Sequence, residues 1–416
     1  MNIYSIIILA ALAIGFILDL VADLLNLKSL KKELPGEFRD VYDADTYANS
    51  QEYTRVRSRF GIFVSTFNLA VLLVFWFAGG FNWLDQLVRG WELGLIWTGL
   101  TYIGLLVVGK TLLSLPFSIY STFVIEERFG FNKTTPKTFV ADMVKGLLLG
   151  ILLGGPLLAG ILAFFTYFET YGWLYAWGAV TLYTLFVQFI APTWIMPLFN
   201  KFEPLEDGDL RQKIQDLADR VKFPLQGIYV MDGSKRSSKS NAFFTGFGNN
   251  KRIALFDTLI EKHTDDELVA VLAHEIGHYK RKHILKNMLL GIVQTGIMFL
   301  LLDIFLQSEG LFEAFYMEQM SVYAGLIFFG LLYAPIEMTL SVFMQIISRK
   351  YEFEADAYAA EVYRSQPMID ALKKLSKDNL SNLTPHPFYV FLNYSHPPVL
   401  ERVNAIRRRA ANPQQK

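Results

Sequence analysis

Seven long apolar segments constrain this chain most, because each is long enough to cross a lipid bilayer. About 20 predominantly apolar residues are needed to span the hydrocarbon core. Blocks such as IIILAALAIGFIL have no polar face to present to water, which argues against buried helices of a soluble core. The sequence therefore predicts a mainly α, polytopic membrane protein with seven transmembrane helices, at 3–25, 61–81, 93–119, 144–168, 173–199, 284–306 and 322–347.

The basic residues predict how the spans are oriented. Of the 39 Lys and Arg residues, 37 lie on one predicted side, Arg89 lies on the other and Lys110 lies inside a span. Loops rich in Lys and Arg stay in the cytoplasm, so we expect the N-terminus outside and the long polar loop and C-terminal segment in the cytoplasm. No basic residue precedes the first apolar run, which favours an uncleaved span over a signal peptide.

Composition limits the chemistry that is available. The chain has no Cys, which excludes disulfides, thiolate catalysis and Cys-ligated metal. Its 39 basic and 39 acidic residues cancel, so nothing suggests a nucleic-acid partner. Any metal site must therefore use His, Asp or Glu.

The polar segments divide the chain into four parts: spans one to five with their loops (1–199), a metalloprotease domain (200–283), spans six and seven (284–347) and a C-terminal cytoplasmic segment (348–416). Within 200–283 the pattern predicts a helix at 210–223 and a strand at 227–231. Two β-prone runs, 241–247 and 251–257, flank a turn at 248–250 and predict a hairpin. Thr264 and Glu267 form a capping box that begins the next helix.

That helix carries the motif His274-Glu275-Ile276-Gly277-His278. Residues four apart on a helix share one face, so both imidazoles can bind one zinc ion. Glu275 lies beside them, where a carboxylate can deprotonate the attacking water. The alternative is an ordinary solvated helix face that happens to carry two histidines.

A zinc hydrolase needs a third protein ligand and an open position. The segment 351–356 directly follows the seventh span, and its Glu352 and Asp356 are four apart on a predicted helix. One of the two can bind the metal while the other supports a ligand imidazole, and Glu354 points elsewhere on that helix. A solvated acidic helix start remains the alternative, and the remaining ligand candidates are His263, His283, His386, His396 or another carboxylate.

An ordered set of motifs, spread over nearly the whole chain, resembles one known family, the type I CAAX prenyl endopeptidases. The motifs are LPFSIYSTFVIEERFGFNKTT (115–135), PLFNKFEPL (197–205), SNAFFTGF (240–247), KRIALFDTL (251–259), HEIGH (274–278), YEFEAD (351–356) and YSHPPVLERV (394–403). HEIGH alone is moderately specific, whereas the ordered set is highly specific.

The resemblance implies a role for each matching residue and a fold in which the spans enclose a large water-filled chamber, with the metal at its cytoplasmic end. It implies one zinc ion held by His274, His278 and Glu352, with Glu275 as general base and Asp356 supporting a ligand from behind. It also implies that His396 and Arg402 reach the active site from the C-terminal segment, and that Asn241, Phe243 and Phe244 belong to the strand that binds substrate.

Polar residues within the spans fit such a chamber, because charges in membrane spans usually face a cavity or a partner. These residues are Asp19, Asp23, Lys110, Gln188, Gln294, Asp303 and Glu337. Polar contacts between helices are the alternative for each one. The short acidic loop at 307–321 and the absence of a dilysine signal at 412–416 leave the compartment open: the endoplasmic reticulum if eukaryotic, the inner membrane if bacterial.

The sequence thus predicts a monomeric, integral-membrane zinc endopeptidase that acts on a peptide or on the C-terminus of a prenylated protein within the lipid bilayer. One rival is an HtpX-like quality-control protease, which shares HEIGH and the third Glu but is a shorter chain with about four spans. The other is a transporter or channel with a structural HExxH, whose substrate ligands would lie near the membrane midplane. The ligand candidates here lie outside the spans.

Overall fold

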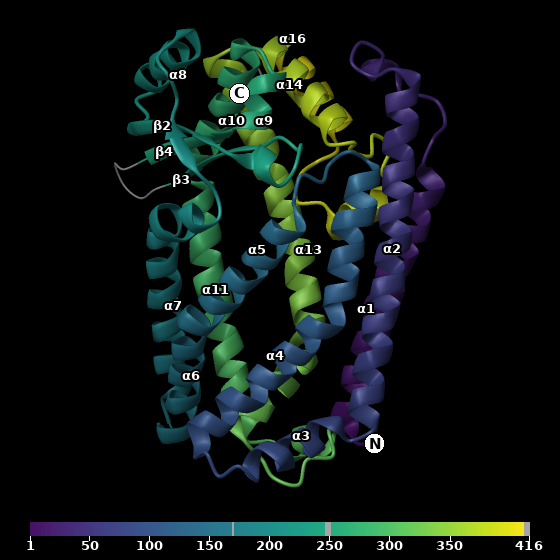
Figure 1. Cartoon of the computed structure of the whole chain (residues 1–416), viewed down its shortest axis with the longest axis vertical. Coiled ribbons are helices and arrows are strands. Elements are labelled where there is room, and N and C mark those ends of the chain that lie inside the picture. The colour runs from purple at the N-terminus through teal and green to yellow at the C-terminus, as the bar shows by residue number, and fades with distance from the viewer. Residues whose placement is uncertain (169, 246–250, 412–416) are drawn as a thin grey trace.

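The computed structural model describes residues 1–168, 170–245 and 251–411. Within these residues seven helical segments are long and apolar enough to cross a membrane, as predicted. Figure 1 shows them running along the long axis of the molecule, with the small sheet, α8, α14 and α16 at one end and the N-terminus and α3 (Gly80–Arg89) at the other. The segments are α1 (Ile3–Ser29), α2 (Ala44–Phe77), α4 with η2 (Leu95–Glu126), α5 through η3 to α6 (Pro136–Tyr167), α7 with η4 and η5 (Gly172–Leu198), α11 (His283–Leu306) and α13 (Val322–Val362).

Two of these helices extend far beyond their predicted apolar blocks. Helix α2 begins at Ala44 rather than at residue 61, because the Asp43 side chain accepts a hydrogen bond from the backbone of Thr46 and caps it there. Helix α13 continues for 41 residues to Val362 rather than ending at 347. Hydropathy marks only the part of a helix that meets lipid, and it does not mark where the helix ends.

A mixed four-stranded sheet lies at the end of the body that carries the C-terminal helices, in the order β1-β2-β4-β3. Strand β2 pairs in parallel with β4, while β1 and β3 pair antiparallel with β2 and β4. The β3/β4 pair confirms the predicted hairpin, although its predicted turn lies outside the described residues. The strands are β1 (Phe202–Pro204), β2 (Leu225–Met231), β3 (Ala242–Thr245) and β4 (Lys251–Phe256), and α8 is Asp209–Arg220.

Helix α10 (Asp265–Lys280) forms the centre of the core at this end. Its start is the predicted capping box: the Thr264 hydroxyl accepts from the Glu267 backbone, and the Glu267 carboxylate accepts from the Thr264 backbone at 2.9 Å. Nearly every side chain from Glu267 to Gly277 is buried, because sheet and helices surround α10. The helices that contact α10 are α13, α14 (Ser365–Asp378), α8, α11 and α9 (Asp257–Lys262). Helix α16 (Val399–Ala411) packs on α13 and α14, α15 (Pro387–Asn393) packs on α1 and α13, and α12 (Glu309–Glu313) lies in the loop between α11 and α13.

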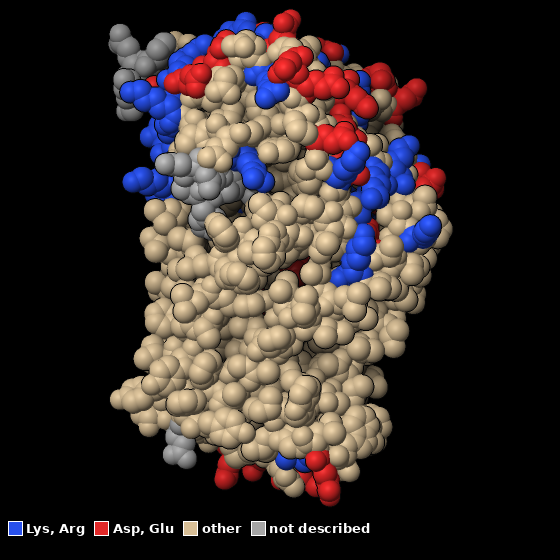
Figure 2. All heavy atoms as spheres, turned by 60° about the vertical axis from the view of Figure 1, so that its left-hand side comes forward, with Lys and Arg blue, Asp and Glu red and all other residues tan. Residues whose placement is uncertain are grey.

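The charged side chains are segregated along the molecule. On the face that Figure 2 draws, a broad and almost uncharged band crosses the body, with Lys, Arg, Asp and Glu gathered at the end that carries the sheet and a few at the opposite end. Four of the seven spans bury only 6% of their most apolar stretch. Few residues of these spans are therefore fully buried, and most keep part of their surface accessible.

Candidate metal centre

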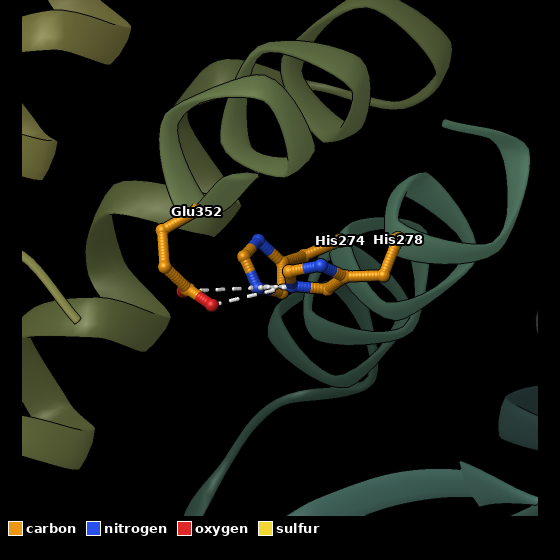
Figure 3. A group of neighbouring side chains, drawn as sticks. All are labelled: His274, His278 and Glu352. Carbon is orange, nitrogen blue, oxygen red and sulfur yellow. Dashed lines mark hydrogen bonds and ion pairs between the residues drawn. The ribbon is translucent and has the colours of Figure 1, made fainter. Parts of the chain in front are cut away.

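His274, His278 and Glu352 converge on one point between α10 and α13 (Figure 3). The Nε2 atoms of His274 and His278 are 3.2 Å apart. Glu352 lies 3.3 Å from His278 Nε2 through Oε1 and 3.5 Å from His274 Nε2 through Oε2. One candidate ligand atom from each residue lies within 4.8 Å of the others. His274 and Glu352 are buried and His278 is half-buried, so all three present lone pairs to the same small volume.

A glycine brings the two helices this close. Gly277 lies on α10, and a Cβ atom at this position would lie 3.0 Å from Cα and 3.1 Å from the carbonyl oxygen of Ala355 on α13. Such contacts leave no room for a side chain. Gly277, the residue directly before His278, thus lets α10 approach α13 closely enough for His278 to meet Glu352.

Asp356 and Arg402 lie behind His274. Asp356 Oδ1 is 2.9 Å from His274 Nδ1, and Arg402 donates to both Asp356 oxygens, from Nε at 2.8 Å and from Nη2 at 2.6 Å. Arg402 Nη1 also lies 3.2 Å from Glu352 Oε2. Burial disfavours the Arg402 charge, but Asp356 outweighs burial and raises the pKa of Arg402 above its ordinary value.

The group attracts positive charge. Burial disfavours a charge on the His274 imidazole, but hydrogen bonds to Asp356 and Glu352 outweigh burial and raise its pKa to about 9. Burial raises the pKa of Glu275, and the neighbouring His274 and His278 oppose that shift. The carboxylates of Glu275, Glu352 and Asp356 therefore lie in one largely buried group with the guanidinium of Arg402. This excess of negative charge favours a bound cation.

The remaining histidines divide into those near the group of His274, His278 and Glu352 and those far from it. His396 Nε2 lies 3.3 Å from Glu352 Oε1, and its side chain is 62% exposed. His283 contacts Nδ1 of His278, the ring nitrogen that faces away from His274 and Glu352. Two other third-ligand candidates lie elsewhere, because His263 Nδ1 contacts the Leu259 carbonyl and His386 caps α15.

The predicted substrate residues lie on or beside the edge strand β3, which packs against α10. The strand begins at Ala242, so Asn241 directly precedes it rather than lying within it, although the Asn241 carbonyl still accepts from the Phe256 backbone at 3.1 Å. Phe243 and Phe244 alternate across the strand. Phe244 packs near Tyr279 in the core, and Phe243 packs near Phe256.

Comparison with known proteins agrees with this geometry. Residues 23–201 match the family model described as CAAX prenyl protease N-terminal, five membrane helices, and residues 204–410 match peptidase family M48. Over 406 residues the chain is 38% identical to CAAX prenyl protease 1 of Saccharomyces cerevisiae, and the match covers 91% of this chain and 89% of that protein. The chain belongs to peptidase family M48.

Other M48 relatives extend the match. The CAAX prenyl protease 1 homolog of Arabidopsis thaliana is 37% identical over 401 residues, which cover 94% of each chain. The crystal structure of S. mikatae Ste24p superposes with a TM-score of 0.91 at 38% identity and covers 98% of this chain and 99% of that one. The protein is therefore a multi-pass membrane metalloendopeptidase, and its family implies a bound metal at the active site.

Proposed function

We propose that this protein is a zinc endopeptidase that removes the C-terminal tripeptide from prenylated CAAX proteins or related peptides. The observation that carries the proposal is the convergence of His274, His278 and Glu352 at one end of a seven-span body. Relatives that match almost the whole chain are named CAAX prenyl protease 1. These matches favour a CAAX prenyl protease over the HtpX-like alternative.

The three converging residues suit one zinc ion per chain. Two imidazoles and a carboxylate, with a fourth position open, are a donor set of catalytic zinc sites. The 3.2 Å between the two Nε2 atoms suits two ligands of one ion, whereas two bare lone pairs at that distance would repel. When bound, zinc acts as a Lewis acid on the scissile carbonyl and on the attacking water.

Glu275 is the general base in this proposal. It takes a proton from the attacking water and returns it to the leaving amine. The raised pKa of Glu275 supports this role, because a proton-transfer group works best when its pKa approaches the operating pH. Its place on α10, between His274 and His278, holds the carboxylate beside the metal ligands.

His396 is better placed than Arg402 to stabilise the oxyanion. Arg402 already donates to both oxygens of Asp356 through Nε and Nη2, and its Nη1 lies against Glu352, so all three guanidinium nitrogens have partners. We infer that Arg402 positions these two carboxylates. His396 has an exposed ring whose Nε2 lies 3.3 Å from Glu352, where an N–H can reach a developing charge.

The substrate backbone adds to β3. Because β3 is the edge of the described sheet, its outer side can hydrogen-bond an extended peptide. Asn241 lies exposed at the start of this edge, where it can contact the peptide. Side chains alternate along such a strand, so Phe243 and Phe244 lie on opposite faces of β3 and would contact the substrate from different sides.

The seven spans, which we call the membrane body, offer apolar surface for the lipid part of the substrate and also carry polar groups in their interior. A cavity of about 460 Å³ lies between α4 and α5, and its lining includes Lys110, Ser114, Ser118 and Asp142. Lys110 donates to Asn68 of α2 at 2.7 Å. Charged and hydroxyl groups at membrane depth suit a water-filled chamber, and the spans around them supply apolar walls.

We place the active site on the cytoplasmic side. The charged end of the molecule carries the sheet and α10, and the positive-inside rule assigns such an end to the cytoplasm. The named relatives are eukaryotic, which supports the endoplasmic reticulum membrane, and we expect a monomer.

The test compares farnesylated and non-farnesylated CAAX peptides with purified protein in detergent, with and without a chelator. We expect cleavage of the farnesylated peptide, loss of cleavage with chelator and recovery on adding zinc. Glu275→Gln should lower kcat by about 10²–10⁴-fold, because it removes the general base, while zinc stoichiometry stays near one. Cleavage by Glu275→Gln at the original rate would refute the assignment of the base.

The HtpX-like alternative predicts a different result. It requires degradation of unfolded membrane protein without cleavage of either peptide. Cleavage of both peptides at equal rates would instead retain the endopeptidase and remove the requirement for the prenyl group.

A further inference from the structure

The two histidines of the HExxH motif have different partners on their outer nitrogens. Nδ1 of His274 lies 2.9 Å from Asp356 Oδ1. Nδ1 of His278 lies 3.0 Å from Nδ1 of His283, and Nε2 of His283 lies 3.0 Å from Glu354 Oε2. One ligand therefore meets a carboxylate directly, and the other reaches a carboxylate through a second imidazole.

A break in the chain brings His283 to this position. Residues five apart on a continuous helix point roughly 140° away from each other, since each residue turns the helix by about 100°. Here α10 ends at Lys280, Lys282 takes a left-handed conformation with φ 58°, and α11 begins at His283. A lysine in this conformation costs about 1–2 kcal/mol and persists where the surroundings enforce it. The turn lets His283 reach the ring of His278.

The ring of His283 is held firmly. It is 2% exposed and stacks on Tyr351 with ring centroids 3.9 Å apart and an interplanar angle of 8°. The Lys286 ammonium lies 5.3 Å from the centroid of the Tyr351 ring. Because these contacts and Glu354 fix the ring, its Nδ1 offers His278 a partner of fixed direction.

The geometry also assigns the protons. A histidine that binds a metal through Nε2 carries its proton on Nδ1, so Nδ1–H of His278 donates and Nδ1 of His283 accepts. The single proton of His283 then lies on Nε2, where it faces the Glu354 carboxylate. The opposite direction would place a proton on His278 Nε2, where the metal must bind.

We propose that His283 and Glu354 are positioning residues that hold the orientation and the tautomer of His278 for zinc. This rests on the proposed function, since it takes His278 as a zinc ligand. Neither residue contacts the metal position, yet both are connected to it through hydrogen bonds. Partners of this kind typically contribute 10–100-fold to metal affinity.

The first test measures zinc affinity of the purified full-length protein by competition with a chromophoric chelator. His283→Phe keeps a ring that can stack on Tyr351 but removes both nitrogens, and we expect affinity to fall about 10–100-fold. His283→Asn places an amide oxygen near the original Nδ1 and should recover most of the loss. Glu354→Gln keeps a neutral acceptor for His283 and should lose less than His283→Phe.

His263→Phe is the matched control. His263 is also a buried histidine, 7% exposed, and its Nδ1 lies near the Leu259 carbonyl, away from the metal position. We expect its zinc affinity to equal that of the original protein. In cobalt-substituted protein, His283→Phe should shift the visible absorption bands, whereas His263→Phe should not.

The outcomes separate the two proposals. No zinc on the original chain would overturn the proposed function and this inference together. Zinc on the original chain with unchanged affinity and spectrum in His283→Phe would overturn the inference alone. A His283→Asn variant with the original thermal midpoint but no recovery of zinc affinity would show that an acceptor at this position does not hold His278, which would also overturn the inference.

Discussion

The catalytic region, which consists of α10 with the sheet and helices around it, and the membrane body pack their apolar residues in opposite ways. Around α10, nearly every side chain from Glu267 to Gly277 is buried. In the membrane body, four of the seven spans bury only 6% of their most apolar stretch. Dense packing fixes side chains in one arrangement, whereas loosely joined spans leave surface for lipid and for an interior. The proposed metal ligands lie where the packing is dense, as a site that needs sub-ångström geometry requires.

The largest effect we expect in this comparison is on stability. Leu272 on α10 is fully buried and Leu152 in η3 (Gly150–Gly154) is 69% exposed. Leu272→Ala removes core contacts and leaves a cavity, which costs about 2–5 kcal/mol. Leu152→Ala leaves no cavity and should cost well under half as much. Thermal unfolding in detergent measures both variants, and equal shifts in Tm would contradict the contrast in packing.

Local signals in the sequence predict part of the arrangement of the candidate metal centre. The capping box of Thr264 and Glu267 set the start of α10, and helical spacing put His274 and His278 on one face. The seven spans followed from apolar length alone. These features depend on residues close together in the chain, so the sequence carries them directly.

Contacts made at a distance were harder to predict. Residue spacing alone left the third ligand open and only the family resemblance named Glu352, because the crossing of α10 with α13 is what distinguishes Glu352 from the other candidates. The turn at Lys282 has no glycine to announce it, so nothing in the sequence showed that His283 contacts His278. Glu354 was expected to point away from Glu352 and Asp356, and its partner His283 begins another helix.

The next prediction uses one substitution in both regions. Gly277→Ala forces a Cβ to within 3.0 Å of Ala355 Cα, whereas a Cβ at Gly146 in α5 meets nothing within 4 Å. We expect Gly277→Ala to destabilise the protein by about 1–3 kcal/mol and to weaken zinc binding, because α13 carries Glu352. Gly146→Ala should stabilise α5 by about 0.5–1 kcal/mol.

Opposite signs in Tm would support the contrast between the regions. A Gly277→Ala variant with the original Tm and zinc affinity would mean that α10 and α13 can separate without consequence. In that case the dense packing at their crossing would not be what positions Glu352.

The smallest effect concerns one of the contacts that join the two regions. Lys239, two residues before Asn241, reaches Glu126 at the end of η2 (Ser121–Glu126) at 2.9 Å and the Tyr53 hydroxyl of α2 at 2.7 Å. The Lys239 side chain is 32% exposed, so solvent screens this pair and it should contribute about 0.5–1 kcal/mol.

Lys239→Met keeps the length of the side chain and removes its charge, so the segment before β3 loses one of its ties to the membrane body, while Arg236 still donates to Asp142 of α5. We expect KM for a farnesylated peptide to rise roughly two- to fivefold, with little change in kcat or Tm, because the packing around α10 is untouched. Lys213→Met is the control, since it removes an exposed ion pair with Asp266 at 3.1 Å that lies wholly within the catalytic region. Equal KM values for the two variants would show that β3 keeps its position without Lys239. A large fall in Tm for Lys239→Met would show instead that the two regions unfold as one unit, and the division between dense and loose packing would then not be a division in stability.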